Sequence, residues 1–223
     1  MAESRIPFVR RVALLAIFAV AMGYLEAAVV VYLRELYYPD GFAFPLRLLP
    51  KSTLLVEVSR EFATLVMLAA VAVIAGKRRW DRFGWFLVLF GVWDVWYYIW
   101  LKLTIGWPSS LSDWDVLFLI PVPWVSPVIA PLLIAVSMIF MGLWITRATE
   151  SNGLYRPGKL AWGLALLGSV FIIYSFVSDT GAVVNQELPQ AYSYWLLALG
   201  LACYWGGFVL SLRHGAGRKL SNK

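Results

Sequence analysis

The stretch that decides the fold is residues 12–33, VALLAIFAVAMGYLEAAVVVYL, in which Glu26 alone interrupts an apolar run. A helix rises 1.5 Å per residue, so a run of this length matches the ~30 Å hydrocarbon core of a bilayer. The residues Arg10-Arg11 and Ala19-Val20-Ala21 are also typical of a secretory signal with a cleavage site, whose removal would leave five spans. Because the apolar run continues through Val31, we favour an uncleaved transmembrane helix.

Five further runs of bilayer-spanning length come after the first one along the chain. With about 20 residues needed for each crossing, the predicted spans are 12–33, 54–76, 83–101, 125–146, 160–178 and 192–212. Proline, glycine and clustered charges separate them, as expected of connecting loops. The sequence therefore predicts an all-α, polytopic integral membrane bundle of about six helices, forming a single transmembrane domain over residues 1–223.

The overall composition agrees with a lipid environment. Hydrophobic residues make up 61% of the chain and charged residues 14%, whereas a soluble domain has about 45–50% and 25%. The net charge is +6, but the basic residues form no stripe on a soluble face of the kind that binds nucleic acid. We therefore expect no nucleic-acid partner. The lone cysteine, Cys203, excludes a disulfide framework within the chain.

Orientation can be predicted from the distribution of Lys and Arg, which accumulate in short cytoplasmic loops. Most of the 19 basic residues lie in the N-terminal segment, in 77–82, in 147–159 and in the basic tail 213–223. The others are expected outside or at the outer interface; they are Arg34, Arg47, Lys51, Arg60 and Lys102. The pattern predicts a multi-pass protein of the cell (inner) membrane with both termini in the cytoplasm.

The region before the fourth span is the least regular part of the chain. Ser112 with Asp115 three residues later has the spacing of a capping box and predicts a short helix. The apolar part, 114–120, is too short to cross a bilayer, and prolines interrupt residues 121–131. We therefore expect a short interfacial or re-entrant segment over 113–120.

Two carboxylates fall well inside predicted spans, where an ionised side chain costs ~2.5–3.5 kcal/mol or more. Counted along the helices from the cytoplasmic end, Glu26 lies at ~21 Å, Asp94 at ~16 Å and Glu61 at ~20 Å. Their similar depth predicts a polar pocket in the outer half of the bundle. The candidate pocket residues are Glu26, Glu57, Glu61, Asp94, Tyr97 and Tyr98.

Local spacing gives these residues partners. Glu57, Glu61 and Thr64 share a helix face, and Arg60 can pair with Glu57 at i+3. Tyr97 or Tyr98 can hydrogen-bond Asp94 across one turn. Carboxylates close together in a low dielectric do not all ionise, so the pocket could hold a proton or a hard cation. The competing interpretation is that the same groups only lock helices together.

Two weaker signals remain. The third span is rich in aromatic residues, which could stack on a cofactor but more often pack against lipid and neighbouring helices; no particular cofactor is indicated. Asp113-Trp114-Asp115 has the D-x-D pattern of metal-dependent glycosyl transfer, which makes Asp113 and Asp115 weak metal candidates beside their role in helix capping.

The sequence leaves three functional hypotheses. The first is a small membrane protein that binds or transports a proton, cation or small polar ligand in the outer-half pocket. The second is an accessory or scaffold subunit that contacts other membrane subunits. The third, with the least support, is a membrane enzyme acting on a lipid-linked substrate through Asp113 and Asp115. The lipid bilayer is the partner common to all three.

Overall fold

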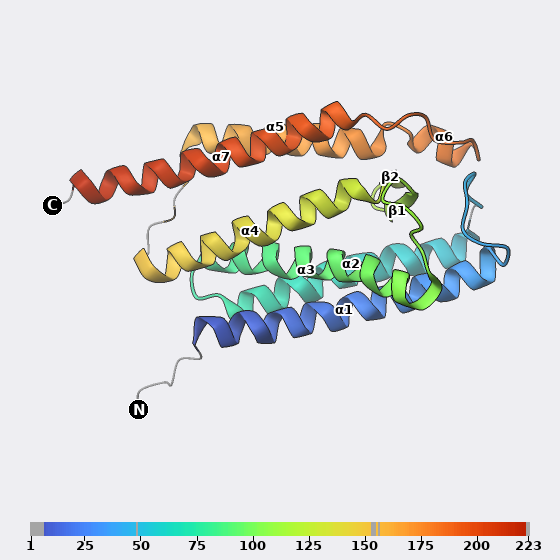
Figure 1. The fold of residues 1–223 in the computed structure, drawn as a ribbon, viewed down its shortest axis with the longest axis horizontal. Helices are drawn as coiled ribbons and strands as arrows, with labels where there is room; N and C mark the ends of the chain where they lie inside the picture. The colour runs from blue at the N-terminus through green and yellow to red at the C-terminus, as the bar shows by residue number, and fades with distance from the viewer. Residues whose placement is uncertain (1–6, 48, 153–154, 156, 222–223) are drawn as a thin grey trace. The chain divides into compact units, whose positions relative to one another are not determined.

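A computed structural model describes residues 7–47, 49–152, 155 and 157–221 of the chain. Long helices dominate it (Figure 1). They are α1 (Phe8–Tyr37), α2 (Lys51–Ala75), α3 (Arg79–Ile105), α4 (Ile129–Asn152), α5 (Lys159–Val177) and α7 (Tyr194–Ser221). A short helix, α6 (Thr180–Val184), and two strands, β1 (Trp114–Phe118) and β2 (Trp124–Pro127), complete the described elements.

Within the described residues, six helices are long and apolar enough to cross a membrane, which confirms the predicted architecture at this level. The fourth begins at Ile129 rather than at 125, because strand β2 occupies 124–127. The predicted tail 213–223 lies partly outside the described residues, and α7 continues as helix to Ser221. The orientation of the termini stays a prediction.

The described chain divides into two compact units. The first comprises residues 7–41, 66–110 and 132–146, so it holds α1, α3, the end of α2 and most of α4. The second comprises 42–65, 111–131 and 147–221, so it holds the start of α2, both strands, α5, α6 and α7.

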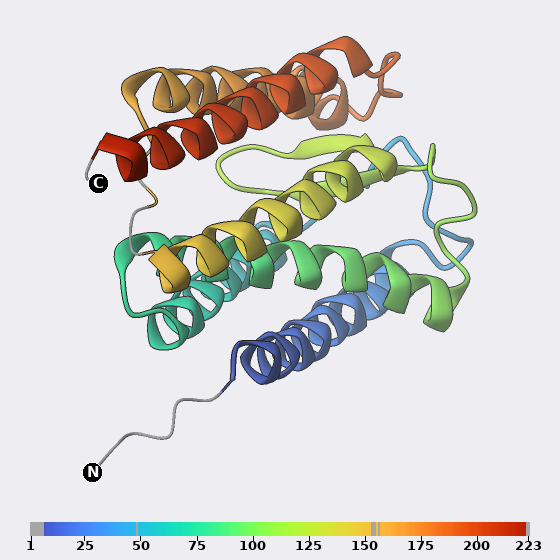
Figure 2. The ribbon, with the colours of Figure 1, turned by 60° about the vertical axis from the view of Figure 1, so that its left-hand side comes forward.

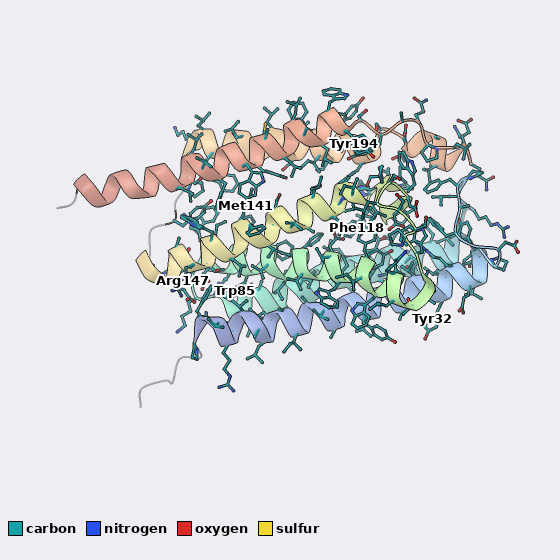
Figure 3. All side chains as sticks on the ribbon, viewed as in Figure 1. Tyr32, Trp85, Phe118, Met141, Arg147 and Tyr194 are labelled. Atoms are coloured by element: carbon teal, nitrogen blue, oxygen red, sulfur yellow. The ribbon has the colours of Figure 1, made fainter. Side chains whose placement is uncertain are left out.

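Glycines let the helices of the first unit approach each other closely. In α1, which runs beside α3 (Figure 1), a Cβ on Gly23 would lie 3.0 Å from the Trp93 carbonyl oxygen and 3.1 Å from the Tyr97 nitrogen. In α3, a Cβ on Gly91 would lie 2.5 Å from the Ala135 carbonyl oxygen of α4. Small residues at such crossings are the usual basis of helix packing in membranes. Trp85, labelled in Figure 3, is fully buried beside the start of α1.

The second unit contains another tightly packed pair, α5 and α7, which lie side by side in Figures 1 and 2. A Cβ on Gly168 would lie 2.9 Å from the Gly200 carbonyl oxygen. The hydroxyl groups of Ser169 and Tyr204 are 2.8 Å apart and form a hydrogen bond across the same interface. Close backbone contact and a partly buried hydrogen bond therefore hold this pair together.

The predicted short helix over 113–120 is wrong, because this segment forms an antiparallel hairpin of β1 and β2 (Figure 2). Asp115 pairs with Ser126 and Val116 with Val125, and a register shift separates Val116 from Phe118. The physical reason lies in the residues after the capping-box pattern. Pro121 and Pro123 lack backbone N–H donors and disfavour helical dihedrals in the residues before them, while aromatic and β-branched residues flank the turn and favour strands.

Candidate functional site

The six predicted pocket residues belong to two compact units, and each group is described by itself. The α1–α3 cluster, in the first unit, consists of Glu26, Asp94, Tyr97 and Tyr98. The hairpin cluster, in the second unit, consists of Glu57, Glu61 and Asp115. Asp115, a buried residue of β1, is included because it belongs to the hairpin whose turn is bonded to Glu61.

The α1–α3 cluster is positioned by the close contact at Gly23. Glu26 is less than one helical turn beyond Gly23, and Asp94 adjoins Trp93, whose carbonyl oxygen limits the space there. Both carboxylate side chains belong to half-buried residues, whereas Tyr97 and Tyr98 are buried. The crossing of α1 and α3 therefore places two carboxylate-bearing residues within about one turn of the same helix contact.

A buried cation, Arg34, lies near the C-terminal end of α1 in this unit. The guanidinium of Arg34, whose residue is 8% exposed, lies 3.7 Å from the centre of the Trp107 ring. That ring is 6.2 Å from Tyr98, which in turn is 4.9 Å from Tyr97. By sequence alone, Arg34 counts among the outer charges. The available signal was its seven-residue spacing from Ala27, which places both on the buried face of α1.

The hairpin cluster is organised around Glu61. This residue is 7% exposed, and its two carboxylate oxygens accept the backbone N–H of Leu119 at 3.1 and 2.9 Å. Glu61 is ten residues into α2, about 15 Å along the helix from Lys51. A single side chain thus secures the turn of the hairpin beside the middle of a membrane-length helix, near Phe118 in Figure 3.

The neighbouring groups on α2 are also buried. Glu57 is 5% exposed and pairs with Arg60 at 2.8 to 2.9 Å, which confirms the predicted pair at i+3. Thr64 is buried on the same face, but its hydroxyl donates to the carbonyl oxygen of Arg60 at 3.1 Å. Glu57 and Glu61 therefore have different roles, one within its helix and the other between α2 and the hairpin.

The weak metal candidates lie at the start of the hairpin. Asp115 is 2% exposed and faces Ser126, which is fully buried, across the ladder. The carbonyl oxygen of Asp113 accepts the Val128 N–H at 2.9 Å, which extends the hairpin pairing. Among the described residues, no three His, Cys, Asp or Glu side chains are grouped as a metal site would need.

Aromatic and hydroxyl groups form the other side of the hairpin. Trp124 packs 6.0 Å from Phe176 of α5, and Trp114 lies 6.1 Å from Tyr192. The hydroxyl of Tyr192 is 2.9 Å from that of Ser175. Burial raises the pKa of Tyr192 to about 12, with a lowering by the Ser175 hydrogen bond and a smaller rise from Tyr194. Tyr192 therefore ties the loop before α7 to the end of α5 as a neutral phenol.

The aromatic residues of α3 contribute to an apolar groove against α1. This shallow, open groove has a volume of about 710 Å³ and is lined by Ala16, Ile17, Val20, Ala21, Tyr24, Leu25, Trp96 and Trp100. The Trp100 indole N–H donates to the carbonyl oxygen of Val20 at 3.1 Å, so its polar atom is already bonded. The lining of the groove is therefore almost entirely apolar.

A comparison of the chain with protein-family models, with curated proteins and with solved structures found no significant match. The functional assignment therefore rests on the geometry of the two clusters.

Proposed function

We propose that this chain is a membrane-embedded binding or transport protein whose cargo is a proton, a cation or a small polar ligand. The hairpin cluster is the main cargo-binding site. The α1–α3 cluster is a second polar binding site in the outer half of the bundle. The observation that carries the proposal is the bond between the Glu61 carboxylate and the Leu119 N–H.

The position of this bond supports a re-entrant hairpin. Leu119 is bonded about 15 Å from the Lys51 end of a helix of membrane-spanning length. Non-helical backbone at that depth is stable where protein buries it or where it lines an aqueous cavity, because lipid offers no hydrogen-bond partners. We therefore infer that the hairpin is a re-entrant segment held by the Glu61 carboxylate, and that polar cargo enters the bundle beside it.

The chemistry of Glu61 suits coupling to a proton. An ionised carboxylate makes a charge-assisted hydrogen bond, roughly twice as strong as one between neutral groups. Protonation of Glu61 removes the negative charge and replaces one acceptor by a hydroxyl group. Proton uptake is thereby linked to weaker attachment of the hairpin, so a proton or competing cation at Glu61 would weaken the bond between α2 and Leu119.

The α1–α3 cluster supports the same function from the first unit. Ionisable residues inside membrane-spanning segments are costly and commonly mark pathways for ions, protons or polar substrates. Glu26 and Asp94 are two such residues, and the buried Arg34 is a cation in the same unit. We expect both carboxylates to contribute to cargo passage, while their tyrosine neighbours supply hydrogen bonds.

The test is ion flux through purified protein reconstituted into liposomes that contain the pH dye pyranine. Under an imposed membrane potential, we expect proton uptake above that of protein-free liposomes, and at least a tenfold loss in Glu61→Gln, which imitates the protonated side chain. Glu35→Gln is the matched control, because Glu35 is exposed near the end of α1.

Separate liposome preparations that contain Na⁺- or K⁺-sensitive dyes test whether the cargo is a metal cation. Flux of any of these ions that depends on Glu61 but not on Glu35 supports the proposal. Flux equal in the wild type and Glu61→Gln, or no proton, Na⁺ or K⁺ flux above the protein-free level, would refute ion passage through the hairpin site.

A further inference from the structure

One end of the first unit carries a dense group of cations that the proposed function does not use. It lies where α1 begins and where the end of α2 turns into α3. We define this basic collar by its members, Arg10, Arg11, Lys77, Arg78, Arg79 and Arg82. All but Arg11 are exposed. Within the described segments 7–11 and 76–83, Asp81 is the acidic residue present, and it is 3% exposed.

Internal hydrogen bonds hold the backbone of the collar in place. The Arg82 Nε donates to the Gly76 carbonyl oxygen at 3.1 Å, and Arg11 Nη1 donates to the Ala75 carbonyl oxygen at 3.4 Å. Asp81 accepts the Lys77 backbone N–H at 2.9 Å. These bonds satisfy groups at the end of α2, and the exposed side chains of Lys77, Arg78 and Arg79 extend from a structured turn.

Aromatic side chains lie directly beside these cations. The Trp80 and Phe83 rings are 6.0 Å apart, and the Arg79 guanidinium lies 5.5 Å from the centre of the Trp80 ring. Arg11 lies 5.5 Å from the centre of the Trp85 ring. Tryptophan is enriched at the level of lipid headgroups, so the collar combines positive charge with the side chains that mark the membrane interface.

We propose that the basic collar is a binding site for the phosphate headgroup of an anionic phospholipid. Exposed cations from two segments meet the headgroup, and the apolar surfaces of α1 and α3 meet its acyl chains. Basic patches at helix ends attract anionic lipid with ~1 kcal/mol per Lys or Arg. The orientation predicted from the sequence places this end in the cytoplasmic leaflet.

The test is native mass spectrometry of the purified protein titrated in detergent with phosphatidylglycerol and, separately, with phosphatidylcholine. We compare Lys77→Gln/Arg78→Gln with Arg47→Gln/Lys51→Gln. Both variants lose one Lys and one Arg at exposed positions, but the second pair lies outside the collar. The double change in the collar should weaken phosphatidylglycerol binding about 30-fold, taking ~1 kcal/mol per residue and 1.4 kcal/mol per tenfold.

Binding of phosphatidylglycerol but not phosphatidylcholine, lost in the collar variant and kept in the control variant, is the expected result. Equal binding of both lipids, or equal loss in both variants, would overturn the proposal. Titration with soluble glycerol phosphate separates the two sources of phosphate. If it displaces the lipid at similar concentration, the collar is a site for free phosphate esters and the lipid assignment is wrong.

Discussion

Replacing Glu61 by alanine should release the hairpin turn from α2. The change leaves the Leu119 N–H without the two carboxylate contacts at 3.1 and 2.9 Å. A hydrogen bond to a charged group contributes ~1.5–3 kcal/mol, and each 1.4 kcal/mol corresponds to a tenfold change in an equilibrium. If the amide exchanges through opening of this bond, its exchange should accelerate about 10- to 100-fold.

The assay is hydrogen–deuterium exchange with mass spectrometry on protein in lipid nanodiscs, monitored on peptides that contain Leu119. Glu35→Ala serves as the control, because Glu35 is exposed and lies in the other unit. Glu61→Gln should have an intermediate effect, since its amide oxygen still accepts a hydrogen bond without the charge. Unchanged exchange at Leu119 in Glu61→Ala would show that the carboxylate does not hold the turn.

Two further changes test packing and titration. Gly91→Ala should lower the thermal midpoint in detergent, with a loss of ~1–3 kcal/mol from overpacking, because its Cβ would lie 2.5 Å from a carbonyl oxygen of α4. Gly163→Ala, with no neighbour within 4 Å, should not lower it; equal losses in both variants would argue against the close contact. Tyr192 has a pKa of about 12 in the folded chain and near 10 when unfolded, so its stabilisation is complete below pH 10 and lost as the pH rises to 12. The thermal midpoint of the wild type should therefore fall more steeply than that of Tyr192→Phe between pH 10 and 12, and parallel curves would contradict this role.

The local pairing on α2 was predictable, whereas the hairpin was not. Glu57 and Arg60 are one turn apart in one helix, so spacing alone predicts their bond. The capping-box pattern at Ser112 and Asp115 is equally local, but prolines beyond it and strand pairing across the turn override it. Predictions from short sequence motifs fail where a segment pairs with another segment of the chain that the motif does not include.

The candidate site shows the same division. Counting residues along each predicted helix gave Glu26, Glu61 and Asp94 similar depths in the membrane. That count concerns only the distance along each helix. It could not identify the acceptor role of Glu61, because its donor lies 58 residues away in a hairpin. It also left Arg34 among the outer charges, although helical spacing places Arg34 on the same face as buried Ala27.

The sequence by itself determined that this is a helical protein with six membrane-length segments, because the length of an uncharged apolar run is a local property that lipid selects directly. Tertiary structure alone decided that residues 114–127 fold as a hairpin and that the Glu61 carboxylate accepts the Leu119 N–H in the turn of that hairpin. It also decided that Arg34 lies against Trp107. These arrangements depend on contacts between segments far apart in the chain, where the need to satisfy buried polar groups outweighs local preference.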